Sequence, residues 1–189
     1  MKIKGVFTMV FVTLLFFVLF SPFLLFKSEA HSFGESYLLF DRMKTNTSTG
    51  MTLMFTPVDN FDDTGVGKVL RIYFPQGETG VGEWCLANNQ TLTVAGVSES
   101  PVDNASWTID VAVPGTLVAT CYQGGAGEMD YIEVTGIGDL TGGTSYGLEI
   151  SENGTVFKTG VNVGSNLISL QLLEGMKTAS VSFGANLLA

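Results

Sequence analysis

The feature that most constrains this chain is a hydrophobic pattern with a period of two residues. Apolar side chains recur at every second position in residues 51–56 (MTLMFT), 68–74 (KVLRIYF) and 107–113 (WTIDVAV), and a proline follows each run. Side chains two residues apart point to the same face of a β-strand, and a proline ends a strand because it cannot donate a ladder hydrogen bond. The pattern therefore predicts strands with one buried face.

Shorter apolar runs separated by turn residues continue this pattern along the chain. They occupy residues 36–43, 91–94, 117–122, 131–135, 145–150, 156–163, 167–173 and 179–183. The tripeptide Glu152-Asn153-Gly154 predicts a hairpin turn between the runs at 145–150 and 156–163. The 23 glycines of the chain favour tight turns and bulges over helices. We expect an all-β fold, a β-sandwich of about 8–10 short strands.

An uncharged apolar run at residues 5–26 precedes the predicted sandwich, with Lys2 and Lys4 before it. It exceeds the roughly 7–15 residues of an ordinary secretory signal core and suffices for the roughly 20 that span a bilayer. Ser28 and Ala30 place small residues at the −3 and −1 positions of a signal-peptidase site. We expect an N-terminal hydrophobic helix within residues 1–30, a signal peptide or membrane segment, and a single β-sandwich domain in residues 31–189.

Three fates of this segment remain open. Cleavage before His31 releases the domain, and no cleavage leaves it tethered to the membrane through residues 5–26. The pair Lys4-Gly5 before the apolar run resembles the leader of type IV pilins and archaeal pilin-like proteins. That resemblance implies cleavage before Val6 and a pilin-like subunit that retains its N-terminal helix. Positive charge before the run keeps the N-terminus in the cytoplasm in every case, so we expect an extracellular or cell-surface domain.

Charge and cysteine content narrow the class further. The chain has 18 Asp and Glu against 9 Lys and Arg, a net charge of −9. This balance argues against binding nucleic acid, whose phosphates require basic side chains. Cys85 and Cys121 are the only two cysteines. In an exported protein such a pair predicts a disulfide, with two free buried thiols as the alternative.

The stretch from residue 51 to residue 75 carries a family resemblance. The sequence MTLMFTP, followed by GKVLRIYFP at residues 67–75, resembles the opening strands of immunoglobulin-like domains in bacterial and archaeal surface proteins. The resemblance implies an immunoglobulin-like β-sandwich with a surface or adhesive role. The antibody-type arrangement is not implied, because Trp107 comes long after Cys85 and shortly before Cys121.

No catalytic set is recognisable. A Ser-His-Asp relay, a Cys-His nucleophile and a two-histidine copper site all need a well-placed histidine, and the copper site needs two. The only histidine is His31, at the predicted mature terminus. Paired carboxylates cannot be placed from sequence. We therefore expect no enzyme activity and no obligatory cofactor.

Two further sets of side chains suggest surface sites. One loop offers hard oxygen ligands for calcium, although without the spacing of an EF-hand, and a solvated turn is the alternative. Its polar residues are Asp59, Asn60, Asp62 and Asp63. Four Asn-x-Ser/Thr sequences predict N-glycosylation in turns, with chance occurrence as the alternative. They begin at Asn46, Asn89, Asn104 and Asn153.

Two functions fit these features. The first is a secreted or cell-surface structural or adhesive subunit that assembles with itself or with other surface proteins into a filament or layer. It would use the apolar terminal strands in residues 31–43 and 167–189, which can pair with a sheet edge of another subunit. The second is an extracellular module that binds glycans or another ligand. Its loop aromatics Trp84, Tyr122 and Tyr146 would stack on sugar faces.

Overall fold

The computed structural model describes residues 30–42, 47–75, 84–98, 109–157 and 167–184. The apolar run at residues 5–26, and the helix predicted for it, lie outside these residues. Within the described part of the chain, no helix is long and apolar enough to cross a membrane.

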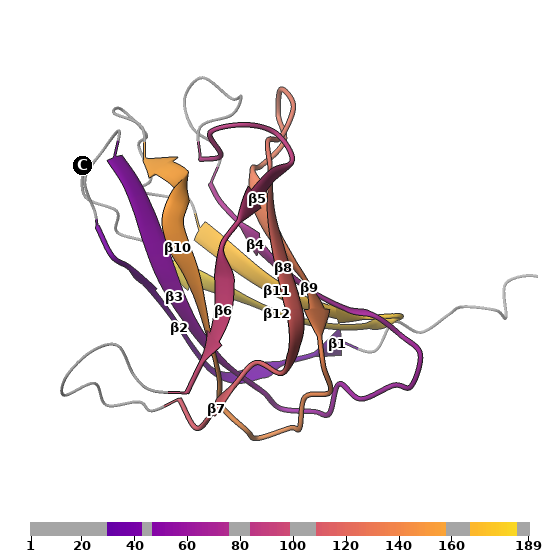
Figure 1. Ribbon diagram of the computed structural model, residues 1–189. Helices are drawn as coiled ribbons and strands as arrows, with labels where there is room; N and C mark the ends of the chain where they lie inside the picture. Colours follow the sequence, from indigo (N-terminus) through magenta and orange to yellow (C-terminus); the bar gives the residue numbers. More distant parts are fainter. Residues whose placement is uncertain (1–29, 43–46, 76–83, 99–108, 158–166, 185–189) are drawn as a thin grey trace, which may run out of the picture.

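Two sheets pack face to face to form a β-sandwich (Figure 1). The seven-stranded sheet has the order β1-β12-β11-β4-β9-β8-β5. Its strands are β1 (Ala30–His31), β12 (Lys177–Gly184), β11 (Leu167–Glu174), β4 (Lys68–Tyr73), β9 (Tyr131–Ile137), β8 (Gly115–Tyr122) and β5 (Gln90–Leu92). All neighbours in it are antiparallel except β1 and β12, which are parallel.

The five-stranded sheet has the order β2-β3-β10-β6, and β7 also pairs with β10. Its strands are β2 (Phe33–Phe40), β3 (Thr47–Pro57), β10 (Tyr146–Phe157), β6 (Val94–Val97) and β7 (Val111–Ala112). Pairing is antiparallel except between β7 and β10. The expected all-β sandwich is therefore confirmed, with more strands than the sequence predicted, and with β3 and β10 longer than their predicted runs.

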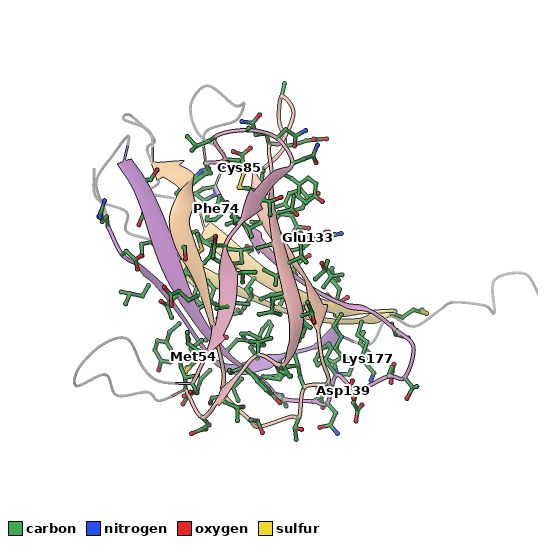
Figure 2. All side chains as sticks on the ribbon, viewed as in Figure 1. Met54, Phe74, Cys85, Glu133, Asp139 and Lys177 are labelled. Carbon is green, nitrogen blue, oxygen red and sulfur yellow. A yellow bond between two sulfur atoms is a disulfide. The ribbon has the colours of Figure 1, made fainter. Side chains whose placement is uncertain are left out.

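The predicted alternation creates the core between the two sheets. In β4, Leu70 and Ile72 are fully buried, whereas Arg71 and Tyr73 lie on the partly exposed outer face. The long strands β3 and β10 supply Leu53, Phe55, Leu148 and Ile150 from the opposite sheet. Burying a side chain of this size contributes about 1.5–3 kcal/mol. The core side chains of both sheets fill the space between the ribbons (Figure 2).

Both sides of the sandwich are crossed by a strand that changes sheets. Ser32 separates β1 of the seven-stranded sheet from β2 of the five-stranded sheet, and Thr93 separates β5 from β6 in the same way. The corner residues are held by backbone bonds, since Ser32 O accepts from Val58 N and Thr93 O accepts from Ser151 N. Each crossing joins the two sheets at one side of the sandwich.

The predicted hairpin at Glu152-Asn153-Gly154 is wrong, because these residues continue β10. The register against β3 passes from Ile150 opposite Met51 directly to Thr155 opposite Thr49, so the extra residues form a bulge. The 11-residue strand β3 offers a partner beyond the Asn-Gly signal. The chain continues along that partner and does not turn back.

The predicted strand at 107–113 is much shorter in the structure. Residues 107 and 108 lie outside the described chain, and only Val111 and Ala112 pair with β10. Ile109 and Val113 are buried, as the alternation predicted, but Val111 of the same face is 40% exposed. The pairing is short because β6 occupies the same side of β10 along residues 148–150.

Candidate functional site

A buried disulfide closes one end of the seven-stranded sheet. Cys85, in the loop after β4, is joined to Cys121 of β8, and both side chains are at most 2% exposed. The predicted disulfide is confirmed. A disulfide of this kind is compatible with an extracellular location.

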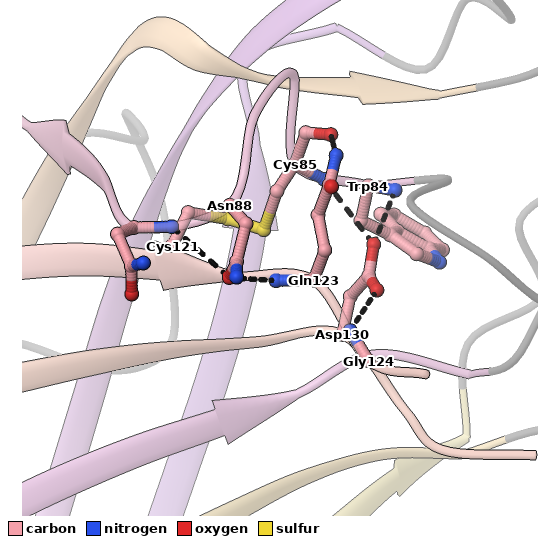
Figure 3. The surroundings of a disulfide bond; sticks show 8 residues. Trp84, Cys85, Asn88, Cys121, Gln123, Gly124 and Asp130 are labelled. Atoms are coloured by element: carbon pink, nitrogen blue, oxygen red, sulfur yellow. Dashed lines mark hydrogen bonds between the residues drawn. A yellow bond between two sulfur atoms is a disulfide. The ribbon is translucent and has the colours of Figure 1, made fainter. Parts of the chain in front are cut away.

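A buried carboxylate clamps the disulfide loop to the neighbouring hairpin (Figure 3). Asp130 Oδ2 accepts hydrogen bonds from the backbone N of Trp84 at 2.9 Å and of Cys85 at 3.3 Å. Its Oδ1 accepts from Gly124 N at 2.8 Å. The side chain, in a residue only 5% exposed, thus satisfies three backbone donors from two loops. The loops beside the disulfide are fixed relative to one another.

Two of the three aromatic residues predicted to stack on a ligand lie in the core. Trp84 is 2% exposed, stacks on Phe74 with ring centroids 4.7 Å apart, and donates from Nε1 to Pro75 O at 2.8 Å. Tyr146 is 4% exposed, and its hydroxyl accepts from Thr141 N at 2.7 Å. Neither ring presents a face to a ligand, because the sandwich uses both to fill space between its sheets.

Tyr122 instead belongs to a row of three tyrosines on the outer face of the seven-stranded sheet. The strand register places Tyr73 of β4 opposite Tyr131 of β9, and Tyr131 opposite Tyr122 of β8. The rings of Tyr122 and Tyr131 stack with centroids 4.9 Å apart, and those of Tyr131 and Tyr73 lie 5.3 Å apart. All three rings are partly exposed. We call them the tyrosine row.

A hollow of about 520 Å³ opens beside the tyrosine row. Besides the three rings it is lined by Asn88, Gln123, Gly124, Gly127, Glu128 and Met129. These residues come from the turn before β5 and from the loop between β8 and β9, the two segments next to the disulfide. The hollow therefore combines aromatic rings from three strands with polar groups from two tethered loops.

Charged groups next to the row set its electrostatics. Arg71 Nε donates to Glu133 Oε2 at 2.9 Å, and the Arg71 guanidinium lies 5.8 Å from the centre of the Tyr131 ring. Burial raises the pKa of Tyr131, and the Glu133 carboxylate raises it further. Burial lowers the pKa of Arg71, but hydrogen bonds to Tyr73 and Glu133 outweigh it and the net shift is upward. Tyr131 thus stays a neutral phenol beside an ion pair.

The four polar residues of the predicted calcium loop turn to different partners. Asp59 Oδ2 lies 2.8 Å from His31 Nδ1, and Asn60 Oδ1 accepts from Gly142 N at 2.8 Å. Asp62 Oδ2 accepts from Asn60 Nδ2 at 3.3 Å, and Asp63 Oδ1 accepts from Lys177 Nζ at 2.9 Å. Among the described residues, no group of three or more acidic, His or Cys side chains is arranged around a metal position. The calcium site stays a prediction that this geometry does not favour.

A second charged cluster lies toward the end of the sandwich opposite the disulfide (Figure 2). The Glu174 side chain is fully buried and lies 3.0 Å from Lys68 Nζ and 3.2 Å from Lys177 Nζ. Lys68 also donates to Asp139 Oδ1 at 2.8 Å, and the backbone N of Asp63 donates to Glu174 Oε1 at 2.9 Å. Because every buried charge here has an opposite partner, the cluster is fully explained as a structural ion-pair network.

Of the predicted glycosylation sites, the structure describes the side chain of one. Asn89 is exposed in the turn before β5, with φ of 59°. The backbone of Asn153 lies in the bulged part of β10, not in the predicted turn. Asn46 and Asn104 lie outside the described residues. Glycosylation stays a prediction.

No model of a known protein family matches the chain, and none of the curated proteins compared with it is similar.

Proposed function

We propose that this protein is a secreted or cell-surface structural or adhesive subunit built on an immunoglobulin-like sandwich. It assembles with copies of itself, or with other surface proteins, through an open sheet edge. The apolar run at residues 5–26 and the disulfide support export. The fate of the N-terminal segment decides whether the subunit is free, tethered or pilin-like.

The sheet order supports the immunoglobulin-like assignment. Immunoglobulin domains place strands A, B, E and D in one sheet and strands G, F and C in the other. The neighbours β2-β3-β10-β6 and β12-β11-β4 fit these two series. Here β9, β8 and β5 extend the second sheet beyond β4. In chain order, β5 comes just before β6, the strand at position D, and β8 and β9 are inserted between β6 and β10, the strand at position E. The domain is thus an elaborated relative of that arrangement.

The observation that carries the assembly proposal is the outer edge of β12. This strand has eight residues, but β1 pairs only with Thr178 and Ala179. Within the described chain, residues 180–184 have no strand partner on that side. The sequence from Thr178 to the C-terminus has no Lys, Arg, Asp, Glu or Pro, the residues that ordinarily protect an edge strand. The edge can therefore accept a strand from another chain.

The terminal strands themselves are used within the domain. Residues 33–40 form β2 on β3, and residues 167–184 form the hairpin of β11 and β12. β2 is the edge strand of the five-stranded sheet. It lies next to β12, which with the short β1 forms the edge of the seven-stranded sheet. In the part of the chain that the structure describes, two open edges thus lie near one another, and the incoming strand is most simply supplied from outside this folded part.

Ser180→Pro tests the proposal. β11 and β12 are joined by the two-residue turn Gly175-Met176, so Glu174 and Lys177 form a hydrogen-bonded pair. Hydrogen-bonded and non-hydrogen-bonded pairs alternate along an antiparallel ladder, which makes Gln171 and Ser180 a non-hydrogen-bonded pair. The N–H of Ser180 therefore points away from β11. Proline at this exposed edge position removes a donor that only an incoming strand would use. Ser180→Ala is the matched control, since it keeps that N–H.

We expect the full chain, recovered from an exporting host, to sediment as species larger than a monomer. Ser180→Pro is expected to shift it to monomer and Ser180→Ala to leave it unchanged. A wild-type protein that stays monomeric at high concentration refutes the assembly proposal. Assembly that persists unchanged in Ser180→Pro refutes the use of this edge.

A further inference from the structure

We propose that the hollow beside the tyrosine row is a binding site for a neutral oligosaccharide. This goes beyond the assembly function, and it uses a different face of the molecule. The hollow lies over β4, β9 and β8, whereas the proposed assembly edge is β12.

The lining has the chemistry that sugars require. A pyranose presents C–H groups on its faces, which pack on aromatic rings, and hydroxyl groups around its rim, which need donors and acceptors. The hollow supplies three phenol rings, the amides of Asn88 and Gln123, and the carboxylate of Glu128. Its volume of about 520 Å³ falls within the roughly 300–1,000 Å³ of small-molecule sites. A short stretch of a saccharide chain therefore fits both its chemistry and its size.

The ring geometry shows where the sugar face would pack. Tyr131 lies between Tyr122 and Tyr73, so neighbouring rings cover its two faces. Tyr122 is at the end of the row, and its face away from Tyr131 is turned toward β5 and the preceding turn, where Asn88 lies. We assign the stacking contact to this face of Tyr122. The edges and hydroxyl groups of Tyr131 and Tyr73 extend the site along the row.

The polar groups of the hollow are already held in place. Asn88 Oδ1 accepts from the backbone N of Asn89 and of Gln123, both at 3.1 Å, which leaves the Asn88 amide NH2 for a ligand. Gln123 Nε2 donates to Cys85 O at 2.9 Å, which leaves Gln123 Oε1 as an acceptor. These bonds tie the rim to the disulfide (Figure 3). Side chains fixed in this way lose little conformational freedom on binding.

Charge selects a neutral ligand. Glu128 is on the rim of the hollow, and Glu133 lies next to Tyr131 on the same face of β9. The whole chain has a net charge of −9. Acidic sugars would be repelled there. The Arg71 guanidinium lies 5.8 Å from the centre of the Tyr131 ring, so a cationic ligand that extends along the row would meet a like charge there.

The test uses the full disulfide-bonded chain, recovered from an exporting host, against a panel of probes. The neutral probes are cellohexaose, xylohexaose, mannohexaose and chitohexaose, and the acidic probe is an oligogalacturonate. Titration calorimetry with the best neutral probe is then repeated for Tyr122→Ala and Tyr122→Phe. Tyr37→Ala is the control, since Tyr37 is an exposed tyrosine of β2 in the other sheet.

We expect at least one neutral probe to bind and Tyr122→Ala to weaken it about tenfold or more, the scale of one lost aromatic contact. Tyr122→Phe is expected to stay within about threefold, since it keeps the ring, and Tyr37→Ala to match wild type. Three results overturn the proposal: no binding of any neutral probe, preference for the acidic probe, or unchanged affinity in Tyr122→Ala. Sedimentation of the same samples reads assembly separately, so either proposal can fail alone.

Discussion

Removing the Asp130 carboxylate isolates the contribution of the clamp that joins the disulfide loop to the β8–β9 loop. In Asp130→Ala, the backbone N–H groups of Trp84, Cys85 and Gly124 lose their acceptor in a buried region. A buried donor left without a partner costs about 1–3 kcal/mol. Water entering the vacated space recovers part of that cost, so we expect a loss of about 3–5 kcal/mol in the free energy of unfolding.

Asp130→Asn gives a graded comparison. The amide oxygen at the Oδ2 position keeps the bonds from Trp84 and Cys85, but the NH2 group then faces the N–H of Gly124. One donor is orphaned and the two remaining bonds lose their ionic partner, so we expect about 1.5–3 kcal/mol. Asp110→Asn, at an exposed carboxylate, is the control and should change stability by less than about 0.5 kcal/mol.

The assay is equilibrium unfolding in urea with the disulfide intact, followed by tryptophan fluorescence. The order of stability should be wild type, then Asp130→Asn, then Asp130→Ala. If the two substitutions destabilise equally, or both by less than about 1 kcal/mol, the clamp is not the source of this stability.

Three other predictions follow from the disulfide and the charged cluster. Replacing both Cys85 and Cys121 by Ser should lower the free energy of unfolding by about 4 kcal/mol, because the disulfide closes a loop with a sequence separation of 36. A change below about 1 kcal/mol in urea titrations would contradict this. Glu174→Gln should cost about 1–3 kcal/mol, because it removes the buried carboxylate that two ammonium groups share and leaves Lys68 with Asp139 alone and Lys177 with Asp63 alone. The exposed control Glu149→Gln should be neutral, and equal urea midpoints for the two variants would refute the contribution of the buried network. Burial lowers the pKa of Lys68, but hydrogen bonds to its carboxylate partners outweigh this, so the pKa in the folded state is raised above 10.5. The stability that the charged Lys68 contributes is therefore complete below pH 10.5 and is lost as the pH rises through the folded-state pKa. Urea midpoints should therefore fall above that pH, and Lys68→Met should flatten the fall.

The positions of the strands could be read largely from the sequence because alternation acts locally. The runs at 51–56 and 68–74 became β3 and β4, and prolines ended or followed them as expected. The disulfide was also predictable, since an apolar run typical of export precedes the domain and two cysteines have one pairing available. The Asn-Gly signal failed because the choice between a hairpin and a bulge depends on how far the partner strand extends.

The site was only partly predictable. Tyr122 lines the candidate site, whereas Trp84 and Tyr146 are buried in the core, because an aromatic residue near a predicted turn can still pack between the sheets. The missed residues did carry a signal. Tyr73 and Tyr131 occupy the polar faces of alternating strands. Tyr73 is on the same face of β4 as Arg71, and Tyr131 is on the same face of β9 as Glu133 and Thr135. That parity predicts exposure for each ring separately.

The sequence by itself determined that the chain forms strands, where most of them lie and which face of most is buried, and it favoured a disulfide between the two cysteines. Only the tertiary structure decided that three separate tyrosines form one row, that Asp130 holds two loops together, and that most of β12 pairs on one side only among the described residues. The physical reason is that alternation and turn chemistry depend on neighbours along the chain, whereas strand order and register depend on which distant strands pair. The candidate site is a property of that pairing.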